Sequence, residues 1–406
     1  MSKTGDYIKE YDQYVLGTYT RNPIVVERGE GSWVWDAEGK KYLDFFPGWG
    51  VSSLGHCHPV VVEAVKEQAG RMLHMPNNFY NEWQGRLAHR IVEEVFPGKV
   101  FFGNSGAEAN EGALKLARRF GEPEGRFEII TMNASFHGRS LATITATGQE
   151  KYHSGFGPLI PGFKYVPFND LPALRNVMTD RTTAIMLELV QGEGGVHPAR
   201  LDYVRALREI CDEKRILMIV DEVQTGMGRT GDYFAFSRYG IEPDVITLAK
   251  ALGGGMPIGA FVVKDQFAGH LPPGTHASTF GGSPIVCAAS LAVFRVMAEE
   301  NILDNVREMG DYLREELFRL QEEFPVIKEV RGMGLMLGME LDRECKPVVE
   351  RCLERGLIIN CTAGNVLRVM PACNIKKEEI NQAIEIIRTA LRLEILARPR
   401  KGSEGR

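Results

Sequence analysis

The sequence predicts an α/β protein in which a large, mostly parallel sheet is accompanied by a smaller α+β domain. Two short apolar runs, residues 216–220 and 245–249, lack polar alternation, which is typical of strands buried on both faces of a parallel sheet. Strand-like and helix-like segments alternate through the middle of the chain, and this alternation favours helices on both faces of the sheet. After about residue 298 long charged helices and short strands take over, which indicates a second, smaller unit.

Composition and charge narrow the class of protein. The 406 residues suffice for one large and one smaller domain, and a charged fraction of 25% is typical of a soluble globular chain. A net charge of -5 gives no electrostatic reason to expect nucleic acid or an anionic membrane as partner. The seven cysteines include no CxxC pair, so we expect no disulfide framework and a reducing cytoplasm. The start of the chain lacks the apolar core of a signal peptide, and the apolar helical segment 285–298 is too short to span a bilayer.

Both ends of the chain are expected to build the smaller domain. An aromatic-rich arm to about residue 20 is followed by an antiparallel meander, whose three alternating runs are separated by glycine turns. We assign residues 1–50 and 299–406 to the smaller domain and residues 51–298 to the large one. The second part is predicted to hold a helix at 299–323, strands at 326–331, 334–341, 357–360 and 366–369, and a helix at 377–396. The basic tail 398–406 is predicted to be disordered.

The large domain begins with helical patterns and then alternates. Helices are expected at 60–73, 83–94, 107–120 and 202–214, and strands at 99–102, 128–131, 142–147 and 183–189. The early segment His56-Cys57-His58 raises the question of a metal. Because no second ligand cluster with suitable spacing occurs, we interpret it as a structural loop and predict no metal site.

Asp221 and Lys250 directly follow the two buried runs, at the carboxyl ends of strands where open α/β sheets bind ligands. A desolvated lysine has a lowered pKa and can attack a carbonyl. A nearby aspartate can keep a pyridinium nitrogen protonated, which turns the ring into an electron sink. The pair therefore predicts a site for pyridoxal 5'-phosphate (PLP).

A second feature fits a phosphate group. Gly103 to Gly106 form a turn before a helical pattern, and Ser105 with Glu108 matches a capping box. A turn that leads into a helix N-terminus presents free N–H groups and the positive end of the helix dipole. The plain alternative is a capped helix without a ligand, and the presence of Asp221 and Lys250 favours the phosphate site.

Other candidates are weaker by themselves. Phe136 and Arg139 are suited to stack on a planar cofactor and to bind a carboxylate, but a surface arginine beside a packed phenylalanine is common. Glu188 and Glu193 flank a strand end, where a structural salt bridge is an alternative. Arg368 is a charge within an apolar run and needs a partner. The segment 226–231 matches G-x-G-x-x-G, yet no helix is predicted directly after it, so we do not expect a dinucleotide site.

Taken together, six motifs identify a resemblance that runs from about residue 20 to 395. They are residues 105–111 (SGAEANE), 136–139 (FHGR), 191–195 (QGEGG), 221–226 (DEVQTG), 248–250 (LAK) and 278–282 (STFGG). Their order resembles that of the class-III, ω-type aminotransferases, closest to the acetylornithine branch. The resemblance implies the fold-type I architecture of PLP enzymes and a homodimer with shared active sites.

The resemblance also implies roles for individual residues. Lys250 would hold PLP covalently and shuttle protons, and Asp221 would pair with its ring nitrogen. The remaining cofactor contacts would come from Ser105, Gly106, Ala107, Phe136, Val223, Gln224 and, across the dimer, Thr279. Substrate contacts would come from Arg139, Glu193, Ser278 and Arg368.

The implied reaction moves the terminal amine of N-acetylornithine to 2-oxoglutarate, giving N-acetylglutamate 5-semialdehyde and glutamate. The segment 49–53 departs from the family pattern beside the substrate. Ornithine, succinylornithine, 4-aminobutyrate and carrier-linked lysine therefore stay open as donors. An aminomutase of the glutamate-semialdehyde type, a decarboxylating relative and a non-enzymatic ligand-binding protein are further alternatives.

Overall fold

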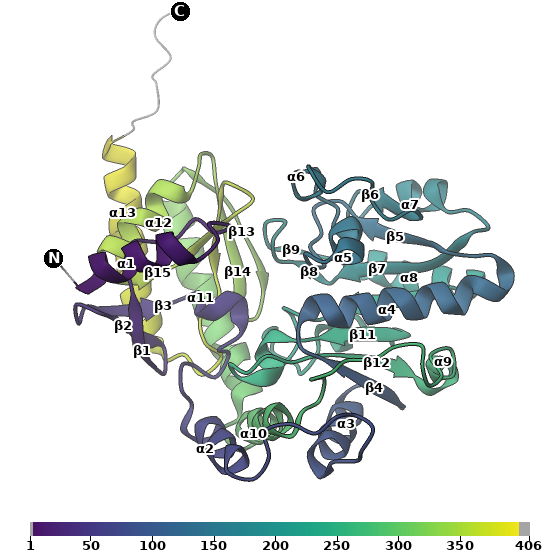
Figure 1. Cartoon of the computed structure of the whole chain (residues 1–406). Helices are drawn as coiled ribbons and strands as arrows, with labels where there is room; N and C mark the ends of the chain where they lie inside the picture. The colour runs from purple at the N-terminus through teal and green to yellow at the C-terminus, as the bar shows by residue number, and fades with distance from the viewer. Residues whose placement is uncertain (1–2, 398–406) are drawn as a thin grey trace, which may run out of the picture.

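A seven-stranded sheet forms the centre of the chain, which a computed structural model describes over residues 3–397 (Figure 1). The strand order is β4-β12-β11-β10-β7-β5-β6, and β12 runs antiparallel to both of its neighbours. The strands are β4 (Gly98–Gly103), β5 (Glu128–Met132), β6 (Phe163–Val166), β7 (Thr182–Glu188), β10 (Leu217–Asp221), β11 (Val245–Leu248) and β12 (Gly259–Lys264). Every residue of β7, β10 and β11 is buried, as the continuous apolar runs predict.

Helices cover both faces of this sheet. The helix α4 (Gly106–Gly121) crosses one face, where Leu114 and Ala117 pack with Leu217 and Ile219 of β10 (Figure 1). Met218 and Val220, the alternate residues of the same strand, belong to the main core on the other face. The other helices of this part are α2 (Pro59–Ala69), α3 (Glu82–Glu94), α5 (Leu141–Ala146), α6 (Glu150–His153), α7 (Leu171–Val177), α8 (Leu201–Lys214), α9 (Asp265–Ala268) and α10 (Pro284–Glu299).

Two smaller sheets combine the start and the end of the chain. One has the order β1-β2-β3-β15, and β3 pairs in parallel with β15 from the far end of the sequence. The other has the order β13-β14-β17-β16. Their strands are β1 (Val26–Glu30), β2 (Trp33–Asp36), β3 (Lys41–Asp44), β13 (Ile327–Met333), β14 (Met336–Leu341), β15 (Leu357–Ile358), β16 (Asn360–Thr362) and β17 (Val366–Val369).

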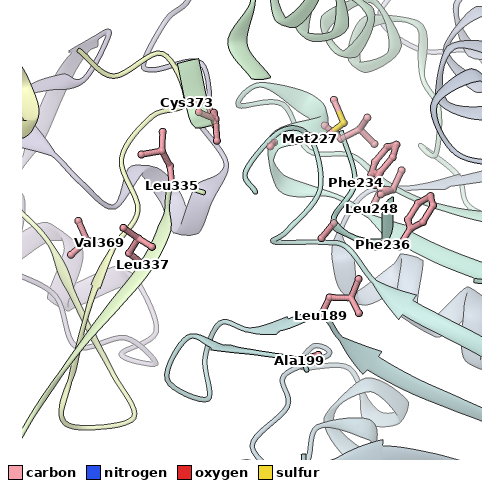
Figure 2. Packing of buried hydrophobic residues seen from close by; sticks show 14 of the residues in the cluster. Leu189, Ala199, Met227, Phe234, Phe236, Leu248, Leu335, Leu337, Val369 and Cys373 are labelled. Atoms are coloured by element: carbon pink, nitrogen blue, oxygen red, sulfur yellow. The ribbon is translucent and has the colours of Figure 1, made fainter. Parts of the chain in front are cut away.

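The helices of this second part are α1 (Lys3–Tyr14), α11 (Ile302–Glu323), α12 (Lys346–Glu354) and α13 (Lys377–Ala397). The indole N–H of Trp33 donates to Glu379 of α13 at 2.9 Å, which ties the first meander to the last helix. One buried cluster continues from the large sheet into the smaller ones. Figure 2 shows Leu248, Phe234 and Phe236 on one side of this cluster and Leu337 and Val369 on the other.

The structure corrects two expectations and adds two strands, β6 and β12, to the large sheet. Residues 141–146 form the helix α5 and not a strand, because Glu111 accepts hydrogen bonds from the N–H groups of Ala142 and Thr143 and so caps a helix. Cys345 and Cys361 form a disulfide, although no local motif indicates one, since the fold brings their Cα atoms to 5.8 Å. The strands β6 and β12 escape the sequence reading. The predicted tail 398–406 lies outside the described residues.

Within residues 3–397, no helix combines the length and apolar character needed to cross a membrane.

A short hairpin of β8 (Val190–Gln191) and β9 (His197–Pro198) follows β7 and carries the loop of Glu193.

Candidate active site

A cavity of about 450 Å³ lies at the carboxyl ends of the parallel strands. Most of the residues that the sequence singles out line this one cavity. They are Ser105, Gly106, Ala107, Phe136, Arg139, Glu188, Glu193, Asp221, Val223, Gln224 and Lys250. The parallel topology explains the convergence, because strands that run the same way deliver the residues that follow them to the same edge of the sheet.

Lys250 begins a short 3-10 helix just after β11. Its backbone has a φ of +46°, a left-handed conformation that residues other than glycine adopt at a cost of about 1–3 kcal/mol. Burial lowers the pKa of the Lys250 amine below its ordinary value, and the carboxylates of Glu193 and Asp221 partly oppose this shift. Burial therefore shifts the amine toward its neutral, nucleophilic form.

Asp221 ends β10 and is almost completely buried. Its Oδ2 accepts a hydrogen bond from the side chain of Asn110 at 2.8 Å and lies 2.8 Å from Nδ1 of His137. Its Oδ1 accepts from the N–H of Val223 at 3.0 Å. Asn110 and His137 fix the carboxylate in one orientation, and sequence reasoning assigns neither of them a role, although both lie inside recognised motifs.

The helix α4 begins at the cavity wall. Ser105 is its N-cap, and its hydroxyl accepts a hydrogen bond from the N–H of Glu108 at 3.2 Å. In a regular capping box the Glu108 carboxylate would accept from the N–H of Ser105. Here it accepts from the N–H of Asn104, at 2.9 Å. A Cβ at Gly106 would lie 2.8 Å from the Val223 side chain, so any larger residue here would have to displace Val223. The first turn of α4 thus presents backbone N–H groups to the cavity, an arrangement that suits a phosphate.

Phe136 and Arg139 line the cavity, and both contact Tyr152, a residue that the sequence analysis does not single out. The guanidinium carbon of Arg139 lies 3.9 Å from the ring centroid of Tyr152, which stacks against it. The Phe136 N–H donates to Glu188 at 2.8 Å, and the Gly192 N–H donates to the same carboxylate at 3.2 Å. Glu188 therefore joins two loops, and burial raises the pKa of its carboxyl to about 7.

Arg368 lies on β17 with its side chain completely buried. Its Nη1 is 2.6 Å from Oε1 of Glu193 and 3.4 Å from Oε1 of Gln224. Its Nε and Nη2 donate to Oδ1 of Asn360 at 3.1 and 2.8 Å. The charge that looks misplaced in an apolar strand is thus paired inside the site with a carboxylate that is 22% exposed.

Two predicted residues stand apart. Ser278 and Thr279 line a different cavity of about 750 Å³ and not the one that holds Lys250. The hydroxyl of Ser278 accepts from the N–H of Gly281 at 3.1 Å and from Asn104 at 3.2 Å. Within one chain, therefore, Thr279 does not line the cavity that Ser105 lines.

The weaker motifs behave as structural features. His56 pairs with Asp44 at 2.8 Å and His58 pairs with Glu300 at 3.2 Å, so the two histidines face different partners. No cluster of three or more metal-ligating side chains occurs among residues 3–397. The segment 226–231 lies within a run of turns, and no α-helix begins directly after it, as the sequence predicts.

A buried lysine, a fixed aspartate and a helix N-terminus around one cavity define a PLP-dependent enzyme, and the residues present fit this cofactor: the Lys250 amine can bind its aldehyde, Asp221 its ring nitrogen, and the first turn of α4 its phosphate. Residues 16–391 match the family described as aminotransferase class-III. The chain belongs to the class-III aminotransferases, and its cofactor is PLP.

Individual relatives agree with this family. The chain is 53% identical over 379 residues to the acetylornithine aminotransferase of Caldanaerobacter subterraneus, covering 92% of this chain and 96% of that protein. It is 51% identical to the enzyme of the same name from Methanocaldococcus jannaschii, with 92% and 95% covered. Ornithine aminotransferase from Toxoplasma gondii superposes with a TM-score of 0.94 at 33% identity, covering 98% and 97%. Acetylornithine aminotransferase from Elizabethkingia anophelis superposes with a TM-score of 0.86 at 32% identity, covering 96% and 100%.

Proposed function

We propose that this protein moves the terminal amine of N-acetylornithine to 2-oxoglutarate and so forms N-acetylglutamate 5-semialdehyde and glutamate, a step of arginine biosynthesis in the cytoplasm. The arrangement that carries the proposal is a cavity lined by Lys250, Arg139 and Glu193, in which the Glu193 carboxylate pairs with the buried guanidinium of Arg368. Similarity to relatives named acetylornithine aminotransferase supports the choice of donor.

PLP, when bound, supplies an electron sink that stabilises negative charge on the substrate carbon. The side chains and backbone N–H groups of this protein would bind and orient the cofactor. Asp221, fixed by three partners, would keep the proton of the ring nitrogen in place. Phe136 and Val223 would flank the ring, Gln224 would contact its hydroxyl, and Ser105, Gly106 and Ala107 would bind its phosphate through the start of α4.

Lys250 has two tasks. It would hold the cofactor when no substrate is present, and its amine, once released, would take a proton from the carbon next to the substrate nitrogen and return it on the cofactor side. The lowered pKa of this buried amine suits the task, because an unprotonated amine is the form that accepts a proton. Burial in the cavity also keeps bulk water from competing for that proton.

Two different substrates must use one cavity in turn. Arg139 would bind the α-carboxylate of the donor, whose far amine then reaches Lys250. During that half-reaction Glu193 would stay on Arg368 and hide its charge. The dicarboxylate 2-oxoglutarate would displace Glu193 and place a carboxylate on Arg368, which brings its carbonyl to the reacting position.

We further propose a homodimer whose two active sites are shared. Within one chain, Ser278 and Thr279 lie outside the cavity of Lys250. A second copy would bring Thr279 of the partner subunit to the phosphate and Ser278 near the far end of the donor.

The test is a visible absorbance spectrum of the PLP-loaded enzyme before and after addition of N-acetylornithine alone. Conversion of the cofactor band to that of pyridoxamine phosphate supports cofactor, half-reaction and donor together. A band that responds only to ornithine or 4-aminobutyrate would replace the donor and keep the transaminase. Turnover that needs no 2-oxoglutarate would instead favour an aminomutase.

A further inference from the structure

The strand β16 (Asn360–Thr362) contacts both members of the Arg368–Glu193 pair. Asn360 accepts two hydrogen bonds from the guanidinium of Arg368, and the hydroxyl of Thr362 donates to the backbone carbonyl of Glu193 at 2.7 Å. Residues two apart on a strand share a face, so Asn360 and Thr362 point the same way. Cys361 between them is joined to Cys345, which holds the strand in place from its other side.

The hydrogen bonds to Asn360 limit which N–H groups of Arg368 can bind another partner. A guanidinium has five N–H donors: one on Nε and two on each terminal nitrogen. Oδ1 of Asn360 takes the Nε proton and one Nη2 proton, at 3.1 and 2.8 Å. The donors that remain are the second Nη2 proton and the two of Nη1, and Nη1 donates to Glu193 at 2.6 Å and to Gln224 at 3.4 Å.

We propose that Asn360 is a positioning residue that makes Arg368 present its Nη1–Nη2 edge, and only this edge, to the carboxylate of the 2-oxo acid. This inference rests on the proposed function, since it concerns how the same site accepts 2-oxoglutarate. Asn360 keeps Arg368 in place while the carboxylate on its other side changes from Glu193 to substrate. A side chain without this contact would let the guanidinium turn toward Glu193 with its Nε–Nη2 edge and bind it more tightly.

The amide is chemically suited to this task. Its oxygen accepts from Arg368 but carries no charge, so the cationic character of the guanidinium stays available to Glu193 or to the substrate. Aspartate at position 360 would have nearly the same shape and would accept the same hydrogen bonds. Its negative charge would neutralise Arg368 permanently and compete with any incoming carboxylate.

The experiment separates the two half-reactions and adds a binding measurement. The enzyme loaded with pyridoxamine phosphate is titrated with glutarate, a five-carbon dicarboxylate that lacks the keto group and cannot react. We expect the dissociation constant of glutarate to rise ~10-fold in Asn360→Ala and further in Asn360→Asp, because hydrogen bonds to a charged group are lost or its charge is neutralised. The donor half-reaction of the PLP-loaded enzyme should stay within about twofold of wild type, since it does not use Arg368.

Asn365→Ala is the matched control, because Asn365 lies next to β17, is bonded to Leu341 and Glu340 and does not line the cavity. Unchanged glutarate binding in Asn360→Ala and Asn360→Asp would overturn the inference. So would equal losses in both half-reactions that Asn360→Asp restores, which would mark a purely structural role. If Asn360→Ala does not fold, Asn360→Asp, which preserves the shape, decides. A wild-type enzyme whose pyridoxamine form ignores 2-oxoglutarate would overturn the proposed function as well.

Discussion

The two buried charges of the active site are held in opposite ways. Asp221 receives a backbone N–H, an asparagine amide and a histidine, all from the part of the chain that packs on the large sheet. Arg368 sits on a small sheet, and one of its partners is Glu193, a partly exposed carboxylate on a loop. On the proposed function, the site fixes the charge that would face the cofactor, and it lets the partner of the charge that would face the substrates be exchanged.

The largest effect should come from Lys250 on the fixed side. We expect Lys250→Ala to lower turnover by ~10⁴-fold, because both the covalent hold on the cofactor and the proton transfer depend on this amine. Steady-state rates with saturating N-acetylornithine and 2-oxoglutarate measure the loss. Lys99→Ala is a suitable control, since Lys99 is largely exposed and pairs only loosely with Asp265. A Lys250→Ala enzyme of normal activity would refute the assignment.

A smaller but still large loss is expected at the other fixed charge. Asp221→Asn keeps the shape of the side chain but cannot hold a proton on the ring nitrogen, so turnover should fall by about 10²–10³-fold. Binding of PLP to the cofactor-free protein, followed by absorbance, should weaken in parallel. Activity within a few-fold of wild type would mean that the fixed carboxylate stabilises the fold and does not serve the chemistry.

On the exchangeable side, Glu193→Gln should change selectivity more than rate. Without a carboxylate opposite Arg368, the charge of the guanidinium stays unpaired during the donor half-reaction. Dicarboxylates can then bind to it and compete with the donor. We expect glutarate to inhibit that half-reaction ~10-fold more strongly than in wild type. Glu329→Gln provides a control, because Glu329 pairs with Arg331 outside the cavity. Equal inhibition of Glu193→Gln and wild type would show that Glu193 does not neutralise Arg368.

The smallest effect concerns stability on the fixed side. Burial raises the pKa of the Glu222 carboxyl from 4.5 to about 7 in the folded protein. The folded state thus holds this proton more tightly, and the stability that it contributes is complete below pH 4.5 and is lost as the pH rises through about 7.

Glu222→Gln removes this titration and keeps an acceptor for the Phe236 N–H. Between pH 5 and pH 8, wild type should lose about 1–3 kcal/mol of stability relative to the variant. Thermal unfolding of both proteins at the two pH values measures the difference. Parallel pH profiles would contradict the assignment.

Much of the site was predictable because it depends on local sequence. Apolar runs that end in Asp221 and Lys250 locate the strand ends, and the capped turn at Ser105 locates the helix start. What the sequence missed depends on contacts between distant residues. Asn110 and His137 become partners of Asp221 only when α4 and a loop meet β10, and Tyr152 reaches Arg139 only through folding. The segment 142–147, rich in β-branched residues, forms a helix because Glu111 caps it from another element.

The pairing of β3 with β15 has a consequence for how the protein is made. Most of the chain lies between these two strands, so β3 leaves the ribosome long before its neighbour exists. At roughly 5–20 residues per second, the wait lasts on the order of tens of seconds. During that time the meander of β1, β2 and β3 carries an unpaired edge, the kind of surface on which nascent chains associate. Synthesis of β15 therefore ends this vulnerable period, and Arg368, which follows it in the chain, arrives at the site only after that.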